Sequence, residues 1–456
     1  MASADGGLTR SIGLRSAAAI VVANMIGAGI FTTTGFQAEA LGSPVTIYVL
    51  WIVGGVLALC GALAYAELGA ALPQAGGEYV YLREAYGGAF AFMSALVSLT
   101  AGFSAPIAAA LKSLVRYASH FLPALADEPA LVGGLSVNDA LAIALVWALV
   151  AVHTRRLGAG LAFNDGVTVF KVVGILAILL GAALFGDGNT ADLTRVSTDL
   201  SPPSGAPLFA AFGTSLIFVM FCYSGWNSAA YLAGEIRDPA RTLPRALLLG
   251  TSVVVLLYLG LNFVYFYGAG VDGLAGTVEV GLVASRGLFG PGGVTATTVV
   301  LMVSLLASAS AMTLAGPRVY YAAGRDWPPL RFLARTRSRT GVPAVALVTQ
   351  GLFTSLVIVL GRVDQIQQYA GFTLSLFGSL AVSSVIVLRW RRPELARPFR
   401  AWGYPLTPAL FVCVSVWMMY WAFQGRPVES SLGLLTVAVG GGVHWITNAR
   451  TSRGSG

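Results

Sequence analysis

The amino-acid sequence predicts an all-α membrane protein with twelve transmembrane helices. Hydrophobic residues make up 56% of the 456 residues and charged residues only 11%, whereas a soluble domain carries about 25% charged residues. The mean hydropathy of the chain is +0.76. Apolar runs that reach the length needed to cross a bilayer, about 20 residues, recur from one end of the chain to the other.

Twelve apolar segments follow one another along the chain. They cover residues 12–37, 44–72, 88–121, 136–155, 160–186, 207–236, 243–269, 293–324, 341–361, 364–388, 402–423 and 428–448. Residues 73–87 and 270–292 are too short or too polar to span, and their glycines and prolines indicate surface helices or lids. An even number of spans predicts that both termini lie on the same side of the membrane.

Lysine and arginine fall mainly in alternate loops, and the heaviest clusters lie in residues 318–339 and 389–400. The positive-inside rule assigns these loops, and with them both termini, to the cytoplasm. We therefore expect a multi-pass protein of the cytoplasmic (inner) cell membrane, embedded in the lipid bilayer. Because the basic clusters sit in short loops beside the spans, we expect no nucleic-acid partner.

Sequence motifs of enzymes and ATP-driven pumps are missing. The chain contains no Walker A motif, nucleophile elbow or HExxH motif. Its three cysteines, Cys60, Cys222 and Cys413, have neither metal-binding nor disulfide-framework spacing. We therefore expect no enzymatic activity, no cofactor and no metal site.

A glycine pair, Gly27 and Gly29, interrupts the first apolar segment. Each glycine costs roughly 1 kcal/mol of helix propensity against alanine, and backbone opens at membrane depth only where it is buried in protein or lines a cavity. A helix broken here offers amides near Ile30 to a carboxylate and carbonyls near Met25 to an ammonium group. The alternative is that these glycines only let helices pack closely.

The sixth apolar segment has a matching interruption around Ser224 and Gly225. Five spans separate the starts of the two interrupted segments, and an odd number of spans turns the second copy upside down. Glycine-broken helices at corresponding positions of two inverted halves indicate a secondary transporter with a site near the middle of the membrane. The two breaks together suit a zwitterion, whose two charges can be satisfied by backbone groups.

Lys171 lies about halfway along the fifth segment. It is about 11 residues from either end, roughly 16 Å at 1.5 Å per residue, too far for easy contact with water. Ionisable groups at this depth are costly and usually functional. Two interpretations remain open: a tethered cation that replaces a sodium ion beside the first helix, or a group that loses and regains a proton, because burial disfavours charged lysine.

Three stretches carry a resemblance to a known family: residues 26–31 (IGAGIF), residues 51–87 with the motif PQAGGEY, and residues 221–227 (FCYSGWN). In these stretches the chain resembles the amino acid–polyamine–organocation superfamily, in particular the L-type amino acid transporters and their bacterial relatives. The resemblance implies alternating access and the LeuT-type fold, a 5+5 inverted repeat with discontinuous helices 1 and 6 plus two extra helices. The resulting divisions are a cytoplasmic tail (1–11), the first repeat (12–186), an extracellular loop (187–206), the second repeat (207–388), the last two spans (389–448) and a cytoplasmic tail (449–456).

The resemblance also implies the residues of a substrate site. Gly27, Ala28 and Gly29, followed by Ile30 in the second half-helix, would hold the substrate carboxylate. The family often has serine where Ala28 stands, so backbone amides must suffice here. The other implied residues are Ile26 and Phe221 (carbonyls for the amino group), Phe221 again (an aromatic gate), Ser224, Gly225 (space for the side chain) and Asn227 (a hydrogen bond near the substrate or between the broken helices).

Lys171 matches a lysine that several relatives carry at the lost sodium site, which argues against sodium coupling. We expect an exchanger (antiporter) or a proton symporter of small or medium neutral L-amino acids, because segments one, three, six, eight and ten contain no buried acid for a second substrate cation. A polyamine or amine transporter of the same superfamily is the alternative. Glu67 and Glu235 are expected to be structural or gating residues near Arg237 and Arg245.

The resemblance also raises the question of a partner protein. Animal relatives pair with a heavy chain through a cysteine in the loop after the third span. No cysteine lies between His120 and Leu135, so we expect no covalent heavy-chain partner.

Overall fold

The computed structural model describes residues 10, 12–126, 135–155, 157–200, 205–336 and 343–453. The elements of these residues are helices, and an isolated β-bridge between Ile12 and Ile236 belongs to no strand. Most of the expected N-terminal tail, residues 454–456 of the expected C-terminal tail, and parts of the loops at 121–135 and 187–206 lie outside the described residues. The helices are α1 (Leu14–Met25), α2 (Ala28–Leu41), α3 (Pro44–Ala71), α4 (Glu78–Tyr86), α5 (Gly88–Val97), α6 (Ala105–Ala118), α7 (Val137–Arg155), α8 (Leu157–Phe185), α9 (Ala206–Tyr223), α10 (Ser228–Tyr231), α11 (Pro239–Leu274), α12 (Val280–Asp326), α13 (Ala344–Leu360), α14 (Val363–Arg391), α15 (Leu406–Gly425) and α16 (Pro427–Arg453).

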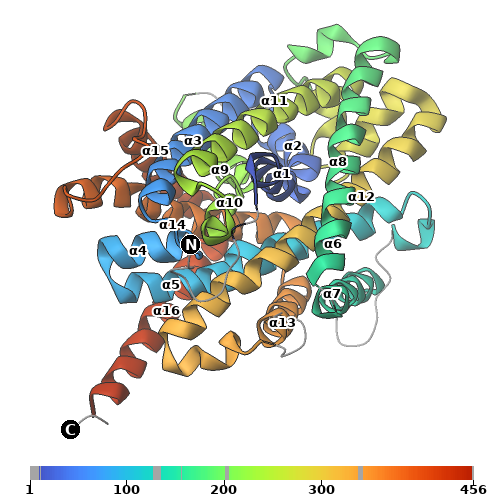
Figure 1. Ribbon diagram of the computed structural model, residues 1–456. Coiled ribbons are helices and arrows are strands. Elements are labelled where there is room, and N and C mark those ends of the chain that lie inside the picture. The colour runs from blue at the N-terminus through green and yellow to red at the C-terminus, as the bar shows by residue number, and fades with distance from the viewer. Residues whose placement is uncertain are drawn as a thin grey trace.

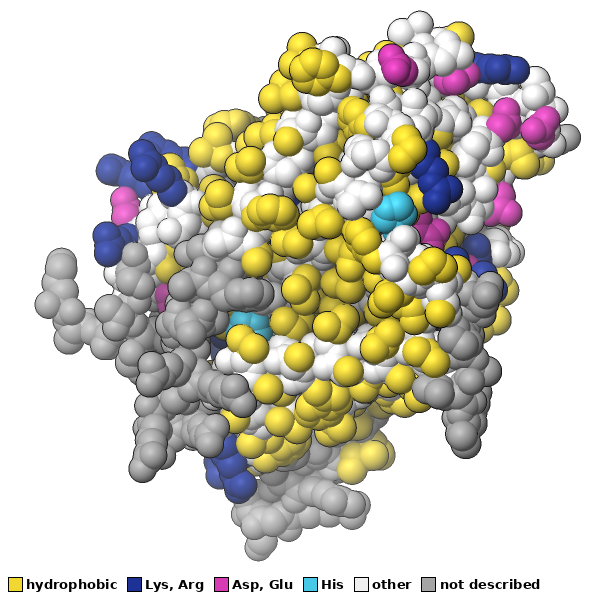
Figure 2. All heavy atoms as spheres, turned by 90° about the vertical axis from the view of Figure 1, so that its right-hand side faces the viewer, with side chains coloured by type: hydrophobic (Ala, Val, Ile, Leu, Met, Phe, Trp, Pro, Cys, Tyr) yellow, Lys and Arg dark blue, Asp and Glu magenta, His cyan; other side chains and the backbone are white. Residues whose placement is uncertain are grey.

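Ten stretches of the described chain are long and apolar enough to cross a membrane. The first joins α1 and α2, and the third joins α5, α6 and the π-helix between them, Ser98–Ser104. Figure 2 shows hydrophobic side chains across the middle of one face of the molecule, with charged side chains near its edges. On α8, exposed apolar side chains include Val169, Val173, Leu180 and Leu184. A surface of this kind is stable against lipid chains, so the chain is a multi-pass membrane protein.

The broken helices lie in the centre of the bundle. In Figure 1, α1 and α2 are enclosed with α9 and α10 among the longer helices. Helix α11 packs against both α3 and α1, while α12 packs against α6 and α8. Every residue of α2 from Ala28 to Gly35 is buried. The helices that we expected to carry a site are therefore shielded from lipid by the rest of the fold.

Residues 73–87 form a helix, as expected, but this helix is not a surface element. Glu78, Tyr79, Val80, Tyr81 and Leu82 of α4 are all buried. Gly76 and Gly77 have positive φ angles of 119° and 53°, and this turn directs α4 back against the bundle, where it packs on α5 and α14. The nine-residue helix is too short to span, yet it contributes buried side chains to the interior.

Residues 270–292 are also helical rather than a separate lid. Helix α11 continues to Leu274, five residues beyond the end we expected from hydropathy, and α12 begins at Val280, thirteen residues before its expected start. Gly270 and Gly290, with φ angles of 63° and 61°, interrupt the two helices and change their direction. The polar composition of this region thus marks bends in long helices.

Candidate functional site

The first helix break separates α1 from α2 at Ile26 and Gly27. Both residues have extended backbone, with ψ angles of 91° at Ile26 and −158° at Gly27, so the helical hydrogen-bond ladder stops after Met25 and restarts at Ala28. No side chain caps the start of α2. The first amides of α2, from Ala28 to Ile30, therefore have no intrahelical partner and carry the positive end of the helix dipole. The second half-helix starts two residues earlier than the Ile30 we expected.

The second break follows α9, which ends at Tyr223. Residues 224–227 form turns before the short helix α10. Gly225 has φ 100°, and a Cβ atom on it would lie 2.9 Å from the carbonyl carbon of Asn24 in α1. A Cβ atom on Gly29 would lie 2.5 Å from the sulfur of Cys222. Glycine at these two positions lets the backbones of the two breaks touch.

Tyr258 of α11 connects the two breaks. Its hydroxyl donates to the carbonyl oxygen of Met25 at 2.6 Å and lies 3.1 Å from the carbonyl oxygen of Cys222. These carbonyls belong to the last turns of α1 and α9, whose acceptors lack helical partners. A buried hydroxyl therefore satisfies groups that the interruptions leave open. Sequence reasoning missed Tyr258, because nothing in a regular apolar helix indicates which tyrosine faces a distant break.

Lys171 of α8 is fully buried and reaches the first break. Its ammonium group donates to the carbonyl oxygens of Ala23 at 2.9 Å and Ile26 at 2.8 Å, and to the hydroxyl oxygen of Ser308 at 2.9 Å. An ammonium group has three N–H donors, so each hydrogen has an acceptor. The Ser308 hydroxyl in turn donates to the Ile26 carbonyl. The lysine thus occupies the carbonyl end of α1 as a bound cation would.

Two small cavities adjoin the breaks. The first, about 10 Å³, is lined by Gly27, Ala28 and Gly29 together with Phe221 and Cys222 of α9. The second is larger, about 70 Å³, and contains Ser224, Gly225 and Asn227 of the second break in its wall. Both cavities have the same three residues in their walls, namely Asn24, Ser224 and Met312. The structure therefore brings most of the expected residues of both breaks around adjoining spaces, whereas Ile26 and Ile30 line neither cavity.

The two carbonyls expected to receive an amino group are already engaged. The Ile26 carbonyl accepts from Lys171 and Ser308, as described above. The Phe221 carbonyl accepts from the backbone N–H of Ser224 at 3.1 Å and from its hydroxyl at 2.6 Å. A carbonyl oxygen has two lone pairs, so neither group is free in this conformation. The hydroxyl of Ser224 is the partner that can rotate away.

Glu78 is the charged residue that the sequence reasoning overlooked in the second cavity. Its carboxylate accepts from the Tyr65 hydroxyl and the Ser98 hydroxyl, each at 3.1 Å, and from the side-chain amide of Asn227, also at 3.1 Å. Burial raises the pKa of Glu78, and these hydrogen bonds offset the rise only in part. Glu78 lies outside the expected spanning segments and enters the bundle from the short helix α4.

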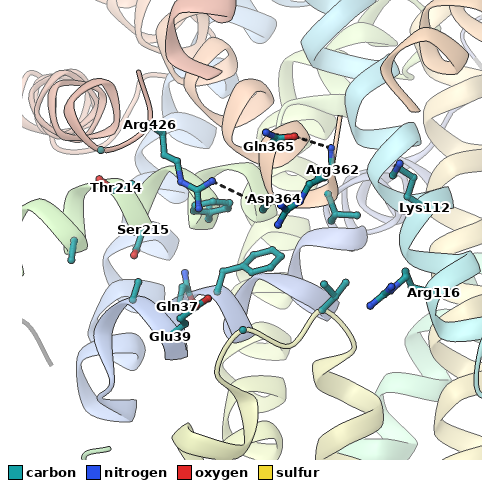
Figure 3. A pocket seen from close by; sticks show the side chains of 18 of the residues that line it. Gln37, Glu39, Lys112, Arg116, Thr214, Ser215, Arg362, Asp364, Gln365 and Arg426 are labelled. Carbon is teal, nitrogen blue, oxygen red and sulfur yellow. Dashed lines mark hydrogen bonds and ion pairs between the residues drawn. The ribbon is translucent and has the colours of Figure 1, made fainter. Parts of the chain in front are cut away.

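A third cavity opens on the face where α2 ends and α14 begins. Its volume is about 1340 Å³. Figure 3 shows Lys112 and Arg116 on one side of it, Arg426 with Gln37 and Glu39 of α2 on the other, and Arg362 with Asp364 between the two sides. The cations have acidic partners: Lys112 with Asp139 at 2.5 Å, Arg116 with Glu279 at 2.9 Å and Arg426 with Asp364 at 3.0 Å.

Ion pairs tie helices together on the opposite face. Glu67 of α3 accepts two hydrogen bonds from the Arg389 guanidinium, at 2.6 and 2.8 Å, and one from the backbone N–H of Ala401 at 2.7 Å. Arg397 lies 3.5 Å from the same carboxylate. Glu235 pairs with Arg318 at 3.3 Å. The arginine partners of both acids come from elements far away in the sequence, whereas the sequence had only indicated a place near Arg237 and Arg245.

No group of three or more His, Cys, Asp or Glu side chains in the described part of the chain is arranged to hold a metal ion. The groups around the breaks are instead peptide dipoles, hydroxyls, one ammonium group and one carboxylate. Such groups can hold a small polar solute through hydrogen bonds and charge alone.

Comparison with known proteins agrees with this chemistry. Residues 12–443 match the amino acid permease family. The human b(0,+)-type amino acid transporter 1 is 28% identical over 425 residues, which cover 92% of this chain and 84% of the relative. The rat large neutral amino acids transporter small subunit 2 is 27% identical over 454 residues, 98% of this chain and 82% of the relative. The matched family therefore covers almost the whole chain, and the protein belongs to the amino acid permease family, as a membrane transporter of amino acids and not an enzyme.

Proposed function

We propose that the protein is a secondary active transporter of small and medium neutral L-amino acids, working by sodium-independent exchange or proton symport. The observation that carries the proposal is the contact between two broken helices, with uncapped amides of α2 on one side of the gap. The carboxylate of an amino acid would bind to the amides of Ala28, Gly29 and Ile30. Its ammonium group would replace the Ser224 hydroxyl on the Phe221 carbonyl, and the Phe221 ring would act as a gate.

The proposal extends to the whole fold. The ten long apolar stretches, with two shorter apolar helices, Pro207–Tyr223 and Ala344–Leu360, would form the twelve spans expected from hydropathy. We assign residues 12–186 and 207–388 to two inverted repeats, each beginning with a broken helix. The arginine-rich loops and both termini belong to the cytoplasmic side of the inner membrane. The large cavity between α2 and α14 then faces outward.

Transport would follow from rocking of one group of helices against the rest. The moving group would contain α1, α2, α3, α9, α10 and α11, which include both breaks and pack on one another. The Glu67–Arg389 pair would close the cytoplasmic side while the outward cavity is open. Lys171 takes the place of a coupling sodium ion, because its ammonium group already fills the acceptors that such an ion would need.

Counterflow in proteoliposomes tests the proposal directly. Vesicles preloaded with unlabelled amino acid should accumulate radiolabelled alanine or leucine in a protein-dependent manner, without sodium. Equal uptake with and without protein would refute transport of these substrates. A pH difference across the membrane separates the two coupling modes, since only a proton symporter should be driven by it.

A polyamine or amine transporter is the second candidate, and the buried Glu78 carboxylate favours it, since a diamine needs an anionic partner. Competition of alanine uptake by putrescine separates the two candidates.

We further propose that the chain works without a covalently bound partner, because no cysteine lies between His120 and Leu135. Purified protein reconstituted alone should therefore be active.

A further inference from the structure

Glu78 has no role in the amino-acid binding proposed above, although its burial is costly. Only 5% of its surface is exposed. Its hydrogen-bond donors Tyr65, Ser98 and Asn227 are all neutral. Among the described residues, no lysine, arginine or histidine forms an ion pair with Glu78. A buried carboxylate without a positive partner leaves a desolvation penalty that a cation can offset.

The position of Glu78 relative to the broken helices defines where such a cation would come from. The cavity at the amides of α2 and the cavity at Glu78 share Asn24, Ser224 and Met312 in their walls. A solute whose carboxylate lies on the α2 amides therefore extends past these shared residues into the second cavity. Asn227, which belongs to the second break, donates directly to Glu78 and marks the end of that path.

We infer that Glu78 is the end of the substrate side-chain pocket and binds a side chain that carries a terminal cation, the chemistry of a basic amino acid. This inference rests on the proposed function, since it assumes that the α-carboxylate and α-amino groups bind at the breaks. An ammonium or guanidinium group forms short charge-assisted hydrogen bonds with a carboxylate. Neutral side chains remain compatible with the same pocket, because Phe103, Met220, Trp226 and Leu374 also line it.

The test compares lysine with norleucine, its neutral analogue of nearly the same length. Uptake of labelled leucine into proteoliposomes is measured with each compound as competitor, for the unaltered protein, Glu78→Gln and Glu84→Gln. Glu84 lies on the same helix, but it pairs with Arg83 and Arg392 outside the cavity. Glu78→Gln should weaken competition by lysine at least about tenfold, the loss of one charged hydrogen bond. Competition by norleucine should change less than about twofold, and Glu84→Gln should change neither.

Each other outcome has a defined meaning. Lysine that does not compete with leucine in the unaltered protein overturns the inference, and so does an equal loss of lysine and norleucine in Glu78→Gln. If Glu78→Gln does not fold, Glu78→Asp takes its place, since it keeps the charge and withdraws it by one methylene; it should weaken lysine selectively, and an equal loss again overturns the inference. Failure of the proposed function looks different: no leucine transport, with lysine still raising the melting temperature of the unaltered protein and not of Glu78→Gln.

Discussion

The ammonium group of Lys171 lies 2.8 Å from the carbonyl oxygen of Ile26, the first residue that leaves the helix at the break in α1 and α2. Together with the Ala23 carbonyl and the Ser308 hydroxyl, this contact accounts for all three N–H groups of the ammonium group. A neutral amine would have one hydrogen fewer than these three acceptors, so the arrangement suits the charged form of the lysine in this conformation.

Lys171→Ala should therefore abolish transport at every pH. The substitution leaves the Ala23 and Ile26 carbonyls without a cation, and uptake should fall at least about tenfold. Leucine counterflow is measured at two pH values on either side of neutrality. Lys171→Met, which keeps the length of the side chain without its charge, should fail equally. Retained transport that no longer depends on pH would instead identify Lys171 as the proton carrier.

Gly225→Ala should stop transport by forcing the two breaks apart. The added Cβ atom would meet the Asn24 carbonyl carbon at 2.9 Å and the Met25 nitrogen at 3.1 Å, and neither is a flexible group. Gly87→Ala is the matched control, because Gly87 also has a positive φ angle, 94°, but nothing lies within 4 Å of its Cβ position. Both variants share the backbone strain, about 1–2 kcal/mol. Transport that survives equally in both would show that the close approach is unimportant.

Glu67→Gln should destabilise the folded protein. The Glu67 carboxylate is 2% exposed and has two arginine partners, Arg389 and Arg397. Removing one side of a buried ion pair costs about 3–5 kcal/mol, and we expect the lower end because Arg389 is partly exposed. Thermal unfolding in detergent measures the effect, with the exposed Glu394→Gln as control. Equal melting temperatures for the two variants would show that the ion pairs of Glu67 with Arg389 and Arg397 do not stabilise the folded protein.

Tyr258→Phe should weaken substrate binding without destroying the fold. The variant keeps the ring but leaves the Met25 and Cys222 carbonyls without their donor. One neutral hydrogen bond corresponds to a change of about tenfold or less, and we expect it as a higher KM for leucine uptake. Tyr420→Phe, at an exposed position on α15, should leave KM unchanged. If Tyr258→Phe leaves the KM for leucine unchanged, the Tyr258 hydroxyl does not contribute to substrate binding.

Most spanning helices were predictable because a long apolar run inside a bilayer must satisfy its own backbone hydrogen bonds, and the α-helix does this within a single segment. The expected limits of the second span, 44–72, differ from those of α3 by one residue. The break at Gly27 was predictable from composition, whereas its end at Ala28 depends on the dihedral angles of Ile26 and Gly27, which no pattern encodes. Burial of Lys171 followed from its depth in an apolar run.

The hydrogen-bond and ion-pair partners of the side chains were harder to predict than the positions of the helices. The acceptors of Lys171 lie on α1 and α12, and Arg389 is 322 residues from Glu67. Such contacts depend on how helices cross in space. Glu78 was missed for a related reason: a short helix with a charged first residue is typical of a surface, and only the packing of α4 reveals that its first turn is buried.

The Tyr258 hydroxyl faces two carbonyl oxygens but carries a single hydrogen. The hydroxyl can therefore donate a well-aligned hydrogen bond to only one of the two carbonyl oxygens at a time, and its contact with the other is weaker. An arriving cationic group that takes over one carbonyl frees this hydrogen for its neighbour. The single hydroxyl hydrogen of Tyr258 thus couples the hydrogen bonding of two backbone segments that lie almost 200 residues apart in the sequence.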